Sequence, residues 1–281
     1  MKLVNKNAEI FIPDNINPDA ALERTTDLCI AAHHDDIEIM AYNAIADCYG
    51  SNDRHFTGVV VTDGGGSPRS GVYADYTNED MKAIRVIEQK TAASIGRYSA
   101  QLLLAHPSGE VKKPNNRAVI DELKSIILAC APEVVYIHNL ADKHDTHVAL
   151  ALRTIEALRE IDTAKRPKKV VAMEVWRALD WLCDEDKMVY DTSAYPNISA
   201  ALIGVFDSQI SGGKRYDLAI QGRWLANATF FASHAVDNLN SATFGLDVTE
   251  LINGDAAPAD FIAAYIDKFK NETLFNIAKF S

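Results

Sequence analysis

The sequence is poor in the features that mark several specialised classes of protein. It has only four cysteines, at positions 29, 48, 130 and 183, and no C-x-x-C pair, so we expect reduced thiols in the core. No stretch approaches about 20 uninterrupted apolar residues, which excludes a membrane-spanning helix. The first residues lack the apolar run and small-residue cleavage site of a signal peptide, so a cytoplasmic protein is expected.

Positive charge is also scarce. Lys and Arg number 28 against 39 Asp and Glu, for a net charge of −11, which argues against a nucleic-acid-binding surface. The chain has 281 residues, 48% of them hydrophobic, and suits one large α/β domain with a modest extension. We predict a core over 25–210 and a less regular extension over 211–281. The order of elements beyond 225 is not predicted, and a homo-oligomer stays open.

The apolar pattern alternates between strands and helices. Five segments have the length and composition of strands: LCIAA, GVVVT, AQLLLAH, EVVYIH and KKVVAMEV. Helical periodicity is found between them over 37–50, 78–96, 115–131 and 146–161. Such alternation predicts an α/β fold with a Rossmann-like, mainly parallel sheet that is flanked by helices.

Polar clusters follow the strands at the points where ligands bind in such sheets. Residues 33–36, 63–69, 106 and 138–147 all lie at the carboxyl ends of predicted strands. Because those ends meet at one edge of a parallel sheet, a shared site is expected there. The densest cluster is His33-His34-Asp35-Asp36, followed closely by Glu38.

Two imidazoles and one carboxylate from these clusters fit a metal site. His33, Asp36 and His147 form a three-ligand set of the kind that binds catalytic zinc and leaves one position open for water. A metal there lowers the pKa of the water and polarises a carbonyl group. Asp35, beside a ligand, is the candidate general base, and His144 is the candidate acid or oxyanion donor. Asp145 is expected to orient His144.

Other polar residues carry weaker signals. Arg69 is a candidate for binding a sugar hydroxyl or phosphate, although a solvated arginine fits as well, and Asn139 and Asp142 are candidates for the pocket wall. Arg85 and Glu88, three apart on one helix, are expected to form a structural pair. The glycines at 64–66 allow either close approach to a ligand or a simple turn. Trp176 is expected in the core or at a rim.

These motifs resemble those of the LmbE-like (PIG-L-type) N-acetylglucosaminyl deacetylases. AHHDDIEI is similar to the AHPDDE-type signature of that family, and DKHDTH is similar to its H-P-D-H motif. VVVTDGGGSP, the R-x-x-E helix and FDSQI also match, so the resemblance runs from about residue 25 to 210. It implies zinc ligands at His33, Asp36 and His147, a general base at Asp35, and a histidine at His144 that stabilises the oxyanion and protonates the amine.

The chain departs from the family pattern at several places. The family's proline is His34 here, which we expect to face solvent in preference to contacting substrate, and Asp145-Thr146 stands where Pro-Asp is usual. Ligands and base are all retained. The expected activity is hydrolysis of an N-acetyl amide on an amino sugar or its conjugate, with one Zn²⁺ or other divalent ion per chain. Two alternatives stay open: hydrolysis of another small amide or ester, and a metal-retaining protein that binds without turnover.

Overall fold

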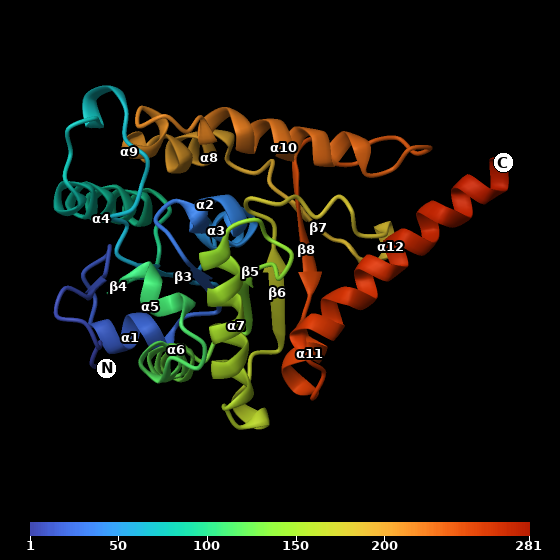
Figure 1. Cartoon of the computed structure of the whole chain (residues 1–281). Coiled ribbons are helices and arrows are strands. Elements are labelled where there is room, and N and C mark those ends of the chain that lie inside the picture. Colours follow the sequence, from blue (N-terminus) through green and yellow to red (C-terminus); the bar gives the residue numbers. More distant parts are fainter.

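One eight-stranded sheet organises the chain, and the computed structural model describes all 281 residues. The strands are β1 (Glu9–Phe11), β2 (Asp27–Ala31), β3 (Phe56–Thr62), β4 (Ala100–His106), β5 (Val134–His138), β6 (Lys169–Met173), β7 (Met188–Asp191) and β8 (Ala242–Asp247). Their order is β1-β4-β3-β2-β5-β6-β8-β7. The central run from β4 to β6 is parallel, whereas β1 and β8 pair antiparallel with its two edges. The predicted fold class is confirmed (Figure 1).

Twelve α-helices surround the sheet. They are α1 (Pro18–Glu23), α2 (Asp36–Met40), α3 (Tyr42–Tyr49), α4 (Asn78–Ile95), α5 (Ser108–Lys112), α6 (Arg117–Cys130), α7 (Asp145–Arg159), α8 (Pro196–Gly204), α9 (Asp207–Ile210), α10 (Tyr216–Phe230), α11 (Thr249–Asn253) and α12 (Pro258–Phe280). The single helix predicted over 37–50 is two helices, because the backbone of Ala41 (φ −123°, ψ 23°) breaks it. α4 begins with a capping box between Thr77 and Asp80.

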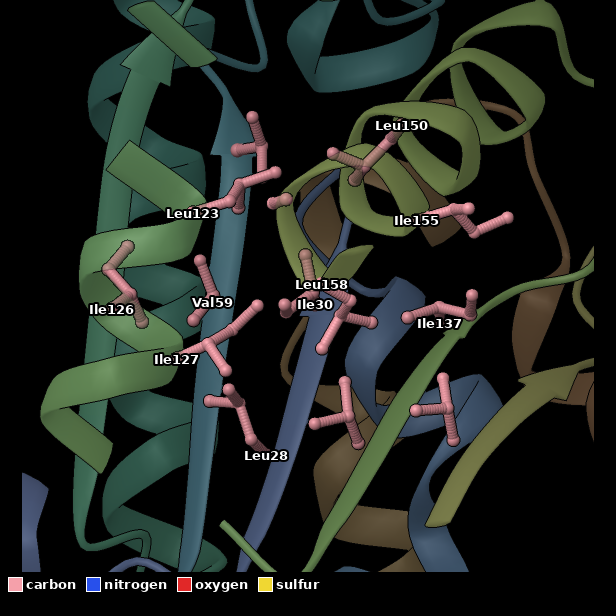
Figure 2. Packing of buried hydrophobic residues seen from close by; sticks show 14 of the residues in the cluster. Leu28, Ile30, Val59, Leu123, Ile126, Ile127, Ile137, Leu150, Ile155 and Leu158 are labelled. Carbon is pink, nitrogen blue, oxygen red and sulfur yellow. The ribbon is translucent and has the colours of Figure 1, made fainter. Parts of the chain in front are cut away.

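Both faces of the sheet are buried, as expected for parallel strands. In β2, Leu28 and Ile30 point into a cluster beneath α6 and α7, which Figure 2 shows, and Cys29 and Ala31 point into a second cluster with α2, α3 and α8. The alternation follows from the two-residue repeat of a strand. Because helices pack on both faces of the sheet, they fix the positions of the loops at the carboxyl ends of the strands. All four cysteines are buried and unpaired, as predicted.

The C-terminal segment is more regular than the sequence indicated. Residues 211–281 contain α10, α11, α12 and strand β8, which is inserted between β6 and β7 in the same sheet. The sequence reading missed β8 because a single glycine-containing strand, ATFGLD, lies outside the alternating pattern. α12 leaves the body at an angle, and its second half projects from it (Figure 1). None of the helices is long and apolar enough to cross a membrane.

Candidate active site and metal centre

A polar cavity of about 430 Å³ lies at the carboxyl ends of the parallel strands. Loops after β2, β3, β4, β5 and β6 contribute to its wall, and residues 209–216 close it from the C-terminal side. Of its 18 lining residues only two are hydrophobic, which suits a substrate rich in hydrogen-bonding groups. His33, Asp35, Asp36 and His144 all reach this cavity.

Three donor atoms converge at one end of the cavity. Nδ1 of His33, Oδ2 of Asp36 and Nε2 of His147 are each 3.1 Å from the other two. Ligand atoms of a tetrahedral zinc ion, at about 2.0–2.1 Å from the metal, are about 3.3 Å apart. The arrangement therefore fits a metal ion with little adjustment. The fold therefore brings together the three side chains expected from the sequence, with His138 and His144 also close by.

Two further histidines lie beside this triangle, but their free electron pairs are engaged elsewhere. Nε2 of His138 is 3.5 Å from Asp36, yet it accepts a hydrogen bond from the Ala32 amide at 2.9 Å. Nδ1 of His144 accepts from the Thr146 amide at 3.3 Å. A nitrogen that accepts a hydrogen bond cannot also donate its electron pair to a metal. We therefore assign neither of these two atoms as a ligand.

The charges of the triangle support one another. Burial disfavours the charged form of Asp36, but the His147, His33 and His138 rings outweigh burial and hold the pKa of this carboxyl well below its usual range. Burial likewise opposes the charged form of His147, while Asp36 and Asp142 raise its pKa to about 9. The site thus stabilises positive charge next to Asp36, which is the condition that a cation needs.

Asp142 supports the triangle from behind. Its Oδ2 lies 3.4 Å from Nδ1 of His147, and its Oδ1 accepts a hydrogen bond from the His144 amide at 3.0 Å. The side chain is buried and does not line the cavity. A carboxylate behind a ligating imidazole fixes the orientation of the ring. Asp142, expected at the pocket wall, therefore acts on His147 instead.

Asp35 is held at the cavity in a strained conformation. Its φ of 88° lies in the left-handed region, which is costly for residues other than glycine and typical of functional sites. Its Oδ2 is 3.3 Å from the Arg85 guanidinium. Burial raises the pKa of Asp35 well above its usual range, and Arg85 opposes this effect. The carboxylate is consequently placed next to the metal triangle without belonging to it.

The expected pair between Arg85 and Glu88 does not form. Arg85 instead donates to the carbonyl oxygen of His34 at 2.6 Å and to Ser67 Oγ at 2.5 Å, as well as to Asp35. Glu88 accepts from the amide and hydroxyl of Ser208 at 2.7 and 2.6 Å. Arg85 thus holds the loops that contain His34 and Ser67, and Glu88 holds the start of α9 at Ser208. The two charges do not pair because each has a closer partner on another element than on α4.

His144 is placed to donate a hydrogen bond into the cavity. Because its Nδ1 accepts from Thr146, the proton of the neutral ring is on Nε2. Burial, with the nearby His33 and His147 rings, lowers the pKa of His144 to about 4. The ring is therefore neutral at pH 7. Of the two roles expected for His144, acid and oxyanion donor, a neutral ring suits the oxyanion donor.

All four candidate substrate contacts lie off the cavity wall: Asp142, described above, and Arg69, Asn139 and Asp145. Arg69 donates to the carbonyl oxygen of Gly65 at 2.8 Å and to Asn78 Oδ1 at 2.5 Å, so it braces its own loop. Asn139 is buried and bonds to the carbonyl oxygen of Met173. Asp145 is exposed, and Thr146 rather than Asp145 fixes the His144 ring. The sequence reading could not separate these roles because all four follow the same kind of strand end.

His34 is buried instead of facing solvent. Its ring is 1% exposed and packs against Gly64, where an added Cβ would come within 3.0 Å of Nδ1. Gly64 also has a φ of 75°, so both sterics and backbone require glycine there. The glycine loop is therefore a tight turn packed on His34, and Gly64 and Gly66 also line the cavity.

The sequence carries little indication of four further lining residues, called the rim group below. They are Trp176, Tyr216, Lys214 and Lys112, and the Trp176 ring lies 6.2 Å from the ring of His144. The Trp176 and Tyr216 rings meet edge to face at 6.1 Å, and the Lys214 ammonium lies 5.0 Å from the Trp176 ring centre. Trp176 is thus a rim residue, in agreement with the expectation. No motif surrounds the two lysines, so spacing alone gave no signal for them.

Comparisons with known proteins agree with this geometry. Residues 28–158 match the family model described as PIG-L, GlcNAc-PI de-N-acetylase. The resemblance predicted from the motifs is therefore confirmed, and the matched segment contains the whole metal triangle, Asp35 and His144. No curated protein matches the chain.

Several solved structures share the fold. The N,N'-diacetylchitobiose deacetylase of Pyrococcus horikoshii is 14% identical with a TM-score of 0.65, over 84% of this chain and 88% of that one. The A40926 pseudoaglycone deacetylase Dbv21 is 16% identical with a TM-score of 0.57, over 80% and 97%. GalB, the 4-carboxy-2-hydroxymuconate hydratase of Pseudomonas putida KT2440, is 18% identical with a TM-score of 0.61, over 83% and 100%. At these identities the likeness establishes the fold alone.

Proposed function

We propose that this chain is a zinc-dependent hydrolase that removes an N-acetyl group from an amino sugar or an amino-sugar conjugate. The observation that carries the proposal is the triangle of His33, Asp36 and His147, with its 3.1 Å edges, beside Asp35 on one cavity wall. The family match and the deacetylases among the similar structures support an N-deacetylase of amino-sugar substrates. The shared fold of a hydratase shows why the site, and not the fold, must carry the argument.

The residues divide the reaction between them. The triangle would hold one zinc ion per chain, which would polarise the acetyl carbonyl as a Lewis acid and make water a better nucleophile. Asp35 accepts a proton from the attacking water, and its raised pKa suits a base that must hold that proton. His144 donates a hydrogen bond from its Nε2–H to the acetyl oxygen as negative charge develops on that oxygen.

The leaving nitrogen needs a proton, and Asp35 supplies it. Because the His144 ring is neutral with a pKa of about 4, the proton that Asp35 took from water is the one available for transfer. The C–N bond then breaks to give acetic acid and a free amine, and proton transfer between them yields acetate and an ammonium group. Water adds across the amide bond, so atoms and charges balance.

The cavity fits a small polar substrate. Its volume of about 430 Å³ lies in the range of about 300–1,000 Å³ that is typical of small-molecule sites. Hydroxyl-rich sugars match the polar lining, and Trp176 offers an aromatic edge against which a sugar ring can rest. Substrate recognition thus falls to the rim group, beside the triangle.

Acetate release tests the proposal. The purified protein is incubated with N-acetylglucosamine, its β-linked disaccharide, an N-acetylated amine without a sugar, and an O-acetyl ester. We expect acetate from an N-acetyl sugar, loss of release after chelation, and recovery when zinc is added back. Turnover of only the ester or the non-sugar amide would favour the broader hydrolase. Bound zinc with no acetate from any compound would favour a binding protein.

A further inference from the structure

The peptide bond between His34 and Asp35 is held at both of its polar groups. Its carbonyl oxygen accepts a hydrogen bond from the Arg85 guanidinium at 2.6 Å, and its N–H donates to Oε1 of Gln89 at 3.2 Å. Arg85 and Gln89 are four residues apart on α4 and therefore share one face of that helix. One helix face thus fixes the plane of the peptide that precedes Asp35.

The backbone on the other side of Asp35 is fixed by α2. The carbonyl oxygen of Asp35 accepts a hydrogen bond from the Ile39 amide at 3.3 Å, at the start of this helix. The φ angle of Asp35, 88°, is the rotation between these two held groups. A left-handed φ at a residue other than glycine persists only where the surroundings hold it in place. The strained backbone of Asp35 is therefore maintained by α2 on one side and by Arg85 and Gln89 on the other.

Gln89 is itself fixed by a buried polar network. Its Nε2 donates to Oε1 of Glu38 at 2.8 Å, and the Tyr98 hydroxyl donates to the same oxygen at 2.7 Å. Gln89 and Glu38 are 0% exposed, and Tyr98 is 1% exposed. Because the Asp35 amide can only donate a hydrogen bond, the oxygen of the Gln89 side chain must face it, and the NH₂ group must face Glu38. Glu38 thus sets the orientation of the Gln89 side-chain amide.

We propose that Gln89 is a positioning residue for Asp35 and that Glu38 acts by orienting Gln89. This inference rests on the proposed role of Asp35 as the general base. Neither Gln89 nor Glu38 lines the cavity, so both act through Asp35. Without the oxygen of Gln89, the buried Asp35 amide has no acceptor, and its peptide is free to rotate toward an ordinary φ. The carboxylate then leaves its place beside the metal triangle.

Gln89 separates the position of Asp35 from its charge, whereas Arg85 does not. The Arg85 guanidinium holds the His34 carbonyl oxygen, but it also lies 3.3 Å from Oδ2 of Asp35 and donates to Ser67. Replacing Arg85 would therefore change the charge next to the base as well as its position. Gln89 is neutral, and its hydrogen bond to Asp35 is made through the backbone amide alone. Substitution of Gln89 is consequently the sharper test.

Gln89→Met tests the positioning role, because methionine keeps the length of the side chain and lacks its amide. At saturating zinc, kcat for acetate release should fall by roughly 10- to 100-fold, since a small displacement of a reacting group has an effect of this size. KM should stay near the parent value, because the residues that line the cavity remain. Metal content should also be unchanged, because Gln89 makes no hydrogen bond to the metal triangle. An unchanged kcat in Gln89→Met would overturn the proposal.

Gln101→Met is the matched control. Gln101 is also 0% exposed, and its Oε1 lies 3.4 Å from Nε2 of Gln89, but it makes no hydrogen bond to the His34–Asp35 peptide. Both variants remove a buried amide and should lower the melting temperature, yet only Gln89→Met should lower kcat. Equal losses of kcat would assign the effect to the core as a whole and overturn the positioning role. Gln89→Asn, one methylene shorter, serves where Gln89→Met does not fold, with the same expected fall in kcat.

Exchange of the two bonded side chains tests the orienting role of Glu38. In Glu38→Gln with Gln89→Glu, a carboxylate oxygen still faces the Asp35 amide, and the other oxygen accepts from the amide introduced at position 38. Most of the kcat that Gln89→Met loses should therefore be retained in this double variant. A kcat as low as that of Gln89→Met, in a folded double variant with metal bound, would overturn the role of Glu38.

Crystal structures of the parent and of Gln89→Met separate this inference from the proposed function. In the variant, we expect the φ of Asp35 to leave 88° for the ordinary negative range, and its carboxylate to move away from Arg85. An Asp35 that keeps its conformation would overturn the positioning role and leave the proposed function standing. A parent protein that releases no acetate from any tested compound would overturn the proposed function, and the conformation of Asp35 in the variant would still decide the positioning role.

Discussion

On the wall that carries His33, Asp36 and His147, each functional side chain is buried or nearly so and is fixed by a neighbour, as Asp142 fixes His147 and Arg85 fixes Asp35. In the rim group of the same cavity, by contrast, Lys112 and Trp176 are exposed, and the Lys214 ammonium lies over the Trp176 ring and not beside a carboxylate. Groups that perform chemistry must be preorganised, whereas groups that select a substrate can vary. We therefore expect the buried, fixed residues to carry the reaction and the exposed residues of the rim group to select the substrate.

The largest loss of activity is expected from removing one of the proposed metal ligands in the triangle. His147→Ala leaves two donor atoms at the site, so metal content should fall sharply and acetate release should fall to background. Elemental analysis by mass spectrometry measures the metal. His138→Gln is the control, because its amide oxygen can still accept from the Ala32 amide. Equal loss of metal in both variants would make His138 a ligand.

Removing the base should have the next largest effect. Asp35→Asn keeps the size of the side chain but cannot accept a proton, so turnover should fall by roughly 10²–10⁴ with metal still bound. Asp63→Asn is the matched control, since Asp63 lines the cavity but pairs with Lys82. Its loss should be less than about tenfold. Near-normal turnover of Asp35→Asn would transfer the role to another carboxylate, such as Glu38.

His144→Ala should reduce turnover by roughly 10²–10³ while zinc stays bound, because one donor to the developing oxyanion is lost. His144→Gln, which keeps an N–H donor, should recover part of the activity. Steady-state kinetics and metal content are measured on the same samples. Loss of metal equal to that of His147→Ala would place His144 among the ligands.

A smaller loss is expected from removing the carboxylate of Asp142, which orients His147. Asp142→Asn removes the charge next to His147 and should weaken metal binding by about 10- to 100-fold. Competition with a chromophoric chelator gives the affinity. At saturating zinc, turnover should return to within a few-fold of the parent. A persistent loss at saturating zinc would mean that Asp142 also acts on the reaction.

The smallest effect on turnover is expected in the rim group. Trp176→Ala should lower kcat/KM by about 2- to 10-fold, through KM, since it removes one aromatic contact worth about 0.5–1.5 kcal/mol. Metal content and melting temperature should not change, because the side chain is exposed. A large fall in kcat with unchanged KM would mean that Trp176 acts in the chemical step, and the contrast between the rim group and the metal triangle would be lost.

The sequence revealed the parts of the site that depend on local order. His33 and Asp36 come soon after β2, and His147 lies in the first turn of the helix that follows β5, so the strand order predicted that these side chains lie close together. The roles of Arg85 and His34 were wrong, since their partners, Ser67 and Gly64, are far away in the sequence. Strand β8 was missed because it pairs antiparallel after a long excursion through α8 and α10.

The position of the site between β2 and β5 has a consequence for how the protein matures. His33 and His147 are separated by 114 residues, and the nearby bond from Ala32 to His138 spans 106. Contacts between such distant parts of a chain form slowly, because a long loop must close first. The donor atoms therefore come together only after the centre of the sheet has assembled. In a nascent or partly folded chain the proposed ligands are still apart, so metal binding at the proposed site would report that the centre of the sheet has assembled.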